Sequence, residues 1–571
     1  MKPRWALGAM LVGMAMLPPL QAGAPEPANS CADPYWQNSL RCRALQILAP
    51  GPMPPPQPVP AAPATVAEVR AYTRVDLGDP DIRCVDGTQP IVYVDRAVDP
   101  DSNKWLITMT GGEFCAAQDL DGNGSFESGN ECLRAYVEQS AQQMGSAGEP
   151  AMSDLTDPDG SGNGILNPDP GINPVFTGYH RVRIHKCGFD RHSGRATHPG
   201  VVAQWPNGGP SLSYDLYSHG QKIVLAALDL LNQQGLGLTY TTWTASGGVV
   251  TETSEHLPSI ADATQVQLIG HSAAGHGLYE NADRYAEHLR AMPGFDGDVR
   301  SVHDAHFMAM VENEAAFDPA QNPDPATVNT LFDQRTVGTT VASGDYDSYR
   351  YHGHPDSPFA DDYRAWAESP GAEADILDAS CVATHAASND IWKCADRFHV
   401  RLHHLSTPAL SREDITDPNA DHGNWPWGYI LWWGQLDQYG HCDGIGNDLF
   451  PFSPCPPVLP PAQIRQRLLV QASHFRAGIH TMSELALDAD PSADSGSVYL
   501  WMPDCTHHGG VYDDLQFYGT SIVRDGTIQS YREFLEAFAA APAQGVIETR
   551  VDGLDGALSE CGPLLLKDSF D

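Results

Sequence analysis

The stretch QVQLIGHSAAGHG, residues 265–277, decides the fold class of this chain. It begins with an apolar, β-branched run typical of a buried strand and continues into an alanine-rich segment of helical composition. Ser272 lies between the two among small residues, where a sharp strand-to-helix turn would expose a nucleophilic hydroxyl. The alternative is a serine that only begins a helix, because serine is a favoured N-cap residue.

Strand-like and helix-like segments alternate around this stretch. Strands are predicted at 91–95, 104–112, 180–186, 266–270, 300–305, 428–434 and 497–503, and helices at 220–235, 273–292, 461–486 and 528–541. Such alternation predicts an α/β fold, here α/β-hydrolase-like, with a mostly parallel sheet and helices on both faces. Residues 311–420 are rich in Asp, His and Pro with weak periodicity, so we expect long loop or lid insertions there.

The N-terminus has the features of an export signal. Lys2 and Arg4 precede the apolar core WALGAMLVGMAML, which is too short to span a bilayer. We therefore predict a signal peptide at 1–24, a Pro/Ala-rich linker at 25–70 and one domain at 71–571. A membrane anchor is the alternative, but no second apolar run of spanning length follows, so no membrane span is expected in the mature chain.

Charge and cysteine content agree with export to the periplasm or the cell exterior. Lys and Arg total 33 against 72 Asp and Glu, which gives a formal net charge of −39. Nucleic acids and anionic membranes bind clustered positive charge, so neither is an expected partner. Export permits disulfides among the 12 cysteines. Close pairs are Cys31/Cys42, Cys115/Cys132, Cys381/Cys394 and Cys442/Cys455, and spacing leaves the partners of Cys84, Cys187, Cys505 and Cys561 open.

Candidate partners for Ser272 follow later strands. A serine hydroxyl needs a base and an orienting acid, and α/β-hydrolases supply them in the order Ser, Asp or Glu, His. Asp437 lies just past the strand predicted at 428–434, and His507 and His508 lie just past the one at 497–503. The C-terminal ends of such strands carry the catalytic loops. The two glycines in TMTGGEFC, residues 108–115, suit a backbone oxyanion hole.

These motifs resemble, in order, those of the pectin acetylesterases and the related Notum carboxylesterases, from about residue 83 to the end of the chain. The matching segments are CVDGTQP, WLITMTGGEFC, NPVFTGYHRVRIHKCGFDRHSG, LYSHGQKI, LIGHSAAG, VHDAHFM, WGQLDQYG and DCTHHGG. The resemblance implies a serine esterase with Ser272 as nucleophile, Asp437 as orienting acid and His508 as base, His507 being the alternative base. It also implies an oxyanion hole formed by the backbone amides of Ala273, Gly112 and Glu113.

Three positions depart from the family pattern. Ala274 replaces a glycine, which tightens the turn around the nucleophile. Glu113 stands near a position where the family often has an aromatic residue or glycine, so its side chain must point away from the oxyanion. HKCGFDRHSG lacks the Cys-Asp-Gly of the family, so substrate contacts in that segment do not transfer.

Two acidic loops have oxygen ligands at alternate positions, as calcium loops do. These ligands are Asp119, Asp121, Asn123 and Ser125 in the first loop, and Asp157, Asp159, Ser161 and Asn163 in the second. The twelfth position of the first loop is Asn130 rather than glutamate, so the match is incomplete. Solvated acidic turns are the alternative. Calcium would be structural here, and catalysis requires no cofactor.

One segment runs against the overall charge. HRVRIHKCGFDRHSGRATH, residues 180–198, contains Arg181, Arg183, Lys186, Arg191 and Arg195. It could contact a carboxylated polymer such as pectin, but we favour internal pairing with the abundant carboxylates. The net charge would also repel polyuronates at low salt.

Together these features predict an exported serine carboxylesterase that removes acetyl groups from a polysaccharide such as pectin. Its substrate would be an acetylated polysaccharide or a small ester. A lipid or acylated-protein carboxylesterase is the first alternative, and it would need a deep apolar acyl pocket. An inactive, calcium-stabilised binding protein is the second, and it would not react with serine-directed probes.

Overall fold

The computed structural model describes residues 72–111, 152–153, 164–305, 377–414 and 496–560, with short gaps inside these ranges. The predicted signal peptide, the linker, the strand at 428–434 and the helix at 461–486 lie outside the described residues.

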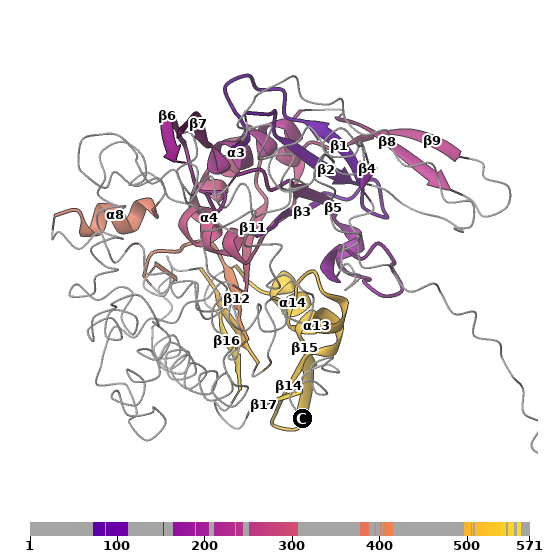
Figure 1. Cartoon of the computed structure of the whole chain (residues 1–571). Helices are drawn as coiled ribbons and strands as arrows, with labels where there is room; N and C mark the ends of the chain where they lie inside the picture. Colours follow the sequence, from indigo (N-terminus) through magenta and orange to yellow (C-terminus); the bar gives the residue numbers. More distant parts are fainter. Residues whose placement is uncertain are drawn as a thin grey trace, which may run out of the picture.

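A ten-stranded sheet forms the centre of the fold (Figure 1), in the order β16-β13-β12-β11-β10-β3-β5-β2-β1-β4. Neighbouring strands are parallel from β16 to β5, and β2, β1 and β4 continue the sheet antiparallel. The α/β prediction with a mostly parallel sheet is therefore confirmed. The strands are β1 (Tyr72–Asp76), β2 (Ile91–Asp95), β3 (Lys104–Met109), β4 (Met152–Ser153), β5 (His180–Ile184), β10 (Gln265–His271), β11 (Asp298–Asp304), β12 (Ala409–Arg412), β13 (Val498–Met502) and β16 (Ile547–Val551).

Helices cover both faces of the sheet (Figure 1). Alternate residues of a strand point to opposite faces, so a strand contributes side chains to two hydrophobic clusters, one on each face of the sheet. Val92 and Val94 of β2 pack in one cluster with α3 (Gly220–Leu231) and α4 (Ala273–Ala291). Ile91 and Tyr93 pack in the other with α13 (Asp514–Gly519) and α14 (Tyr531–Ala540). The sheet is thus buried on both sides, which explains its continuous apolar strands.

Two element boundaries differ from those predicted. The last helix, α14, begins at Tyr531 rather than 528, because Ser530 and Glu533 form a capping box and residues Thr527–Ser530 form strand β15. The insertion predicted at 311–420 cannot include residues Ala409–Arg412, because they form β12 between β11 and β13. This strand has only four residues and contains Ser and Arg, so it lacks an apolar signature.

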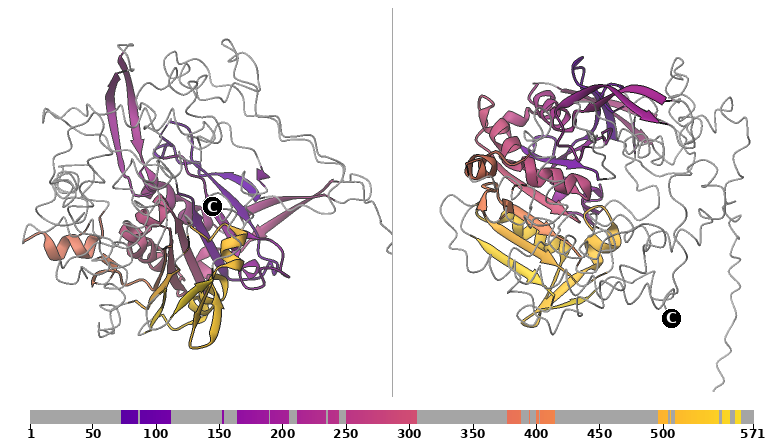
Figure 2. Two further views of the ribbon diagram at one scale, coloured as in Figure 1. Left: turned by 60° about the horizontal axis from the view of Figure 1, so that its bottom comes forward. Right: turned by 60° about the vertical axis from the view of Figure 1, so that its left-hand side comes forward.

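Hairpins and a small sheet surround the main one. The hairpin of β6 (Ala196–Gln204) and β7 (Ser211–Ser218) and that of β8 (Leu236–Trp243) and β9 (Val250–Leu257) extend away from the body of the fold (Figure 2). A three-stranded sheet is formed by β14 (Ser521–Arg524), β15 and β17 (Leu558–Glu560). Short 3₁₀ turns are η3 (Gly164–Leu166), η4 (Phe176–Gly178) and η6 (Ile260–Asp262), and α8 (Ala379–His385) precedes β12.

Disulfides close two loops in the described part of the chain. Cys381 pairs with Cys394, as their spacing suggested, and Cys84 pairs with Cys187 across 103 residues. Cys505 is also disulfide-bonded. Among the helices that the structure describes, none combines the length and the apolar character needed to cross a bilayer.

Candidate active site

Ser272 lies at the turn between β10 and α4 in a conformation that few non-glycine residues adopt. Its φ is 54° and its ψ is −127°, although most L-residues avoid positive φ. It occupies the N-cap position of α4, yet its side chain makes no capping hydrogen bond. The interpretation of Ser272 as an ordinary helix cap therefore does not fit. Such backbone strain concentrates at functional sites.

Small neighbours make this turn fit. A Cβ on Gly270 would lie 2.4 Å from the carbonyl oxygen of Ala274, so no side chain fits at 270. Ala274 itself is fully buried in the core against the sheet. Its methyl group is thus accommodated by packing in the core.

The end of β3 meets the serine turn from the neighbouring strand. β3 and β10 are parallel, with Met109 opposite Gly270. Two residues later, a Cβ on Gly111 would lie 2.3 Å from the Cβ of Ser272 and 2.9 Å from the amide nitrogen of Ala273. The Gly111 backbone therefore lies directly against the Ala273 amide. Gly112 and Glu113, the other predicted oxyanion donors, lie outside the described residues.

A turn at Arg191 and His192, in the left-handed region, contacts the end of β3. Arg191 and His192 have φ values of 58° and 61°, and Nε2 of His192 is 3.1 Å from the carbonyl oxygen of Thr110. Burial lowers the pKa of His192, so the neutral ring donates this hydrogen bond. Its role is visible only in three dimensions, because residues 110 and 192 are far apart in the sequence.

Asp304, at the end of β11, is a further buried carboxylate beside the nucleophile. Its Oδ2 accepts hydrogen bonds from Nδ1 of His271 at 2.8 Å and from the amides of Gly510 and Val511 at 3.0 and 3.2 Å. Its carbonyl oxygen accepts the amide of Ser272 at 2.8 Å. The sequence analysis missed this residue, although an aspartate at the C-terminal end of a predicted strand was an available signal.

Asp304 is kept ionised by its surroundings. Burial alone would raise its pKa, but Arg412, whose Nε lies 3.7 Å from Oδ1, and the hydrogen bonds from His271 and Gly510 hold the pKa below its ordinary value. Arg412 also pairs with Asp414 at 2.7 Å. The site therefore contains a buried ion-pair network of Asp304, Arg412 and Asp414, and the Asp304 carbonyl oxygen joins it to the amide of Ser272.

The remaining predicted partners of Ser272 are Asp437, His508 and the alternative His507, and all three lie outside the described residues. The residues flanking the two histidines are described. Cys505 is buried and disulfide-bonded, and Gly509, with φ 85°, lies against the ring of His271. The calcium candidates Asp119, Asp121, Asn123, Ser125, Asp157, Asp159 and Ser161 also lie outside the described residues.

The basic segment is largely internal. The Arg181 guanidinium forms a salt bridge with Asp95, and both side chains are buried. Arg191 is buried with its Nη1 3.1 Å from Nε2 of His276. Arg195 is exposed. Internal pairing with a carboxylate is therefore confirmed for Arg181, whereas the buried Arg191 contacts a histidine. Both side chains are buried and unavailable to a polymer.

Removal of the Arg181 side chain should be strongly destabilising. Arg181→Ala would leave Asp95 as a buried charge without its ion-pair partner, and such losses cost about 3–5 kcal/mol. We expect that decrease in the free energy of unfolding in urea titrations. The matched control, Arg195→Ala, removes an exposed guanidinium from the same segment and should stay within about 0.5 kcal/mol of the parent. Equal stability of the two variants would contradict the burial argument.

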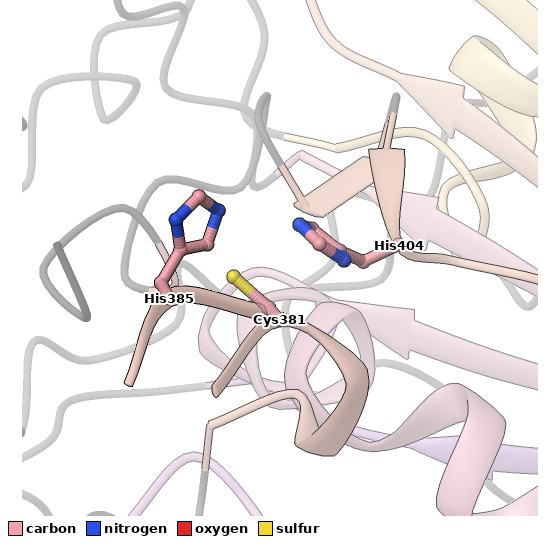
Figure 3. Close-up of side chains that lie close together, drawn as sticks. All are labelled: Cys381, His385 and His404. Carbon is pink, nitrogen blue, oxygen red and sulfur yellow. The ribbon is translucent and has the colours of Figure 1, made fainter. Parts of the chain in front are cut away.

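Cys381 and His385 of α8 lie close to His404, which precedes β12 (Figure 3). Their potential ligand atoms lie within 4.8 Å of one another. Cys381 is, however, bonded to Cys394, so it offers no thiolate. Nδ1 of His404 lies 3.2 Å from the hydroxyl of Ser380. The disulfide-bonded protein therefore lacks the thiolate that would make this cluster a metal site.

This protein is α/β-hydrolase-like. Three features define the class: the mostly parallel sheet, the strained Ser272 after β10, and Gly111 after β3, whose backbone lies against the serine turn. Residues 70–245 match the family model for Pectinacetylesterase. The palmitoleoyl-protein carboxylesterase NOTUM of Schmidtea mediterranea is 26% identical over 213 residues, 37% of this chain and 29% of that protein. The described sheet and serine turn are thus accompanied by similarity to the pectin acetylesterases over residues 70–245 and to a Notum carboxylesterase over 213 residues.

Solved structures of the Wnt deacylase Notum from Drosophila are also similar. One has a TM-score of 0.47 and 16% identity and covers 84% of this chain and 96% of that chain. A second crystal form has a TM-score of 0.45 and 17% identity, covering 83% of this chain and 96% of that chain. The sequence match spans about three tenths of the length of the curated Notum relative.

Proposed function

We propose that this protein is a secreted or periplasmic serine carboxylesterase that removes acetyl groups from a polysaccharide. The observation that carries the proposal is the strained Ser272, held between β10 and α4 with the Gly111 backbone against the Ala273 amide. The match of residues 70–245 to the Pectinacetylesterase model and the similarity to a Notum carboxylesterase support the reaction class. Two disulfides in the described chain agree with an oxidising compartment.

In the proposed reaction, Oγ of Ser272 attacks the ester carbonyl carbon and passes its proton to His508. Asp437 orients the imidazole and balances its positive charge. The amides of Ala273, Gly112 and Glu113 stabilise the oxyanion. His508 then protonates the leaving alcohol oxygen as the ester C–O bond breaks. Water, deprotonated by His508, attacks the acetyl-serine, releases acetate and regenerates the Ser272 hydroxyl.

The structure of the loop after His508 supports this assignment of the base. His508 is bonded to Gly509, and a Cβ on Gly509 would lie 2.0 Å from Cε1 of His271. His271 in turn precedes Ser272. The described chain on the C-terminal side of the two histidines is therefore in contact with the serine turn, which is where a base must be attached.

Acetate release from acetylated pectin and acetylated xylan by the mature chain, with Ser272→Ala as control, tests the proposal. The net charge of −39 favours the neutral polymer at low salt, because polyuronate and protein repel each other. Serine-dependent release would support the esterase and rank the polymers. Failure to react with any ester or with an organophosphate probe would favour the inactive binding protein.

A lipid or acylated-protein esterase is the second candidate, favoured by the palmitoleoyl-protein carboxylesterase among the relatives. The two candidates differ in the acyl chain that they accept. A series of p-nitrophenyl esters from acetyl to hexadecanoyl separates them, because only a deep apolar pocket gains affinity with each added methylene.

Calcium in the two acidic loops remains a proposal. If the ion binds the folded chain alone, its removal should lower the melting temperature by several degrees. We expect this shift when EGTA is added to protein purified in calcium, and reversal when excess calcium is restored. The control is magnesium, which prefers six ligands in stricter geometry and should not restore the melting temperature fully. A melting temperature indifferent to both ions would leave solvated acidic turns as the correct interpretation.

A further inference from the structure

A histidine–carboxylate pair lies beside the nucleophile and outside the proposed triad. In the parallel register of β10 and β11, His271 is opposite Asp304, so the C-terminal ends of the two strands place the side chains together. Nδ1 of His271 lies 2.8 Å from Oδ2 of Asp304. The Asp304 side chain is fully buried, and that of His271 is 22% exposed.

The same carboxylate binds the chain that follows the two predicted base residues. Oδ2 of Asp304 accepts the amides of Gly510 and Val511 at 3.0 and 3.2 Å. The carbonyl oxygen of Asp304 accepts the amide of Ser272 at 2.8 Å. Through these three amides, Asp304 joins the turn that bears the nucleophile to the segment that follows the two histidines.

The His271 ring forms the surface on which this segment rests. A Cβ on Gly509 would lie 2.0 Å from Cε1 and 2.6 Å from Nδ1 of His271, and Gly509 has a φ of 85°. The ring of Tyr512 meets His271 edge-on at a centroid distance of 5.5 Å. Only a glycine backbone can approach the ring this closely.

We propose that Asp304 and His271 are positioning residues that hold residues 509–511, and through them the base at 508 or 507, against the Ser272 turn. This inference rests on the proposed esterase function. The ionised Asp304 accepts a hydrogen bond from Nδ1–H of His271, which fixes the tautomer and the orientation of the ring. The pair performs no bond-making step, so its loss should misplace the base rather than remove it.

The test compares His271→Ala with His271→Asn in the full chain, because an asparagine amide can donate to Asp304 where Nδ1 does. Misplacement of a catalytic group by about 1 Å can cost about 100-fold in rate, so we expect His271→Ala to lower kcat about 10- to 100-fold with KM little changed. His271→Asn should recover most of that loss. The matched control is His288→Ala, which removes another histidine bonded to an aspartate, Asp229 at 2.8 Å, near the far end of α4. It should leave kcat unchanged.

Hydrogen exchange supplies a readout that does not need activity. Peptides covering Gly510 and Val511 should exchange faster in His271→Ala and in Asp304→Asn, and at the parent rate in His288→Ala. If the parent protein hydrolyses no ester, the proposed function fails, while the exchange result still reports on the positioning pair. Parent kcat in His271→Ala, or unchanged exchange, would overturn the inference. A loss as large as that of Ser272→Ala without rescue by asparagine would also overturn it, because it would indicate a direct chemical role.

Discussion

Ser272→Ala should reduce ester hydrolysis by about 10³-fold or more while the protein stays folded. The hydroxyl oxygen is the only atom lost, and without it no acyl-enzyme forms; nucleophile removal in serine hydrolases has effects of this size or larger. Acetate release under saturating substrate measures the loss. The melting temperature should stay close to that of the parent, because alanine retains the Cβ and the side chain makes no helix-capping bond.

Ser272→Gly is the informative companion variant. At φ 54° and ψ −127° a side chain is strained, and glycine relieves a cost of roughly 1 kcal/mol or more. We therefore expect an equally inactive protein that melts at or above the temperature of the parent. An active Ser272→Ala variant, or a fluorophosphonate adduct on that variant, would remove Ser272 from the mechanism.

The turn that carries Ser272, directly after strand β10, was predictable from the sequence. Apolar residues fill both faces of a parallel strand, and the small residues around Ser272 are needed wherever a helix starts so abruptly. The strand β10, the helix α4 and the turn between them were therefore all anticipated from residues 265–277. The prediction used only local information, and the turn is local.

The partners of the supporting residues were not predictable, because they are distant in the chain, even where the residue itself, such as Asp304, follows a predicted strand. Asp304 is 33 residues from His271 and 206 from Gly510. His192 reaches Thr110 across 82 residues. β12 has only the residues ALSR, and its place in the sheet comes from its neighbours. Such contacts depend on strand order, which alternation of strands and helices does not determine.

Gly111→Ala should impair catalysis nearly as severely as loss of an oxyanion donor. The added Cβ would lie 2.3 Å from the Cβ of Ser272, 2.4 Å from the carbonyl oxygen of His271 and 2.9 Å from the Ala273 amide nitrogen. Two of these three atoms belong to the backbone, so no rotamer change can relieve the contact. Either the end of β3 or the serine turn must move.

Either movement separates the Ala273 amide from the chain at 111, and removal of one oxyanion donor costs about 10²–10³ in kcat. We expect kcat of Gly111→Ala to fall by about 10²-fold, with a lower melting temperature. Gly178→Ala is the matched control, since its Cβ would meet nothing within 4 Å. If Gly111→Ala retains the kcat of the parent, the end of β3 moves without disturbing catalysis. The oxyanion hole would then be formed by residues other than 111–113.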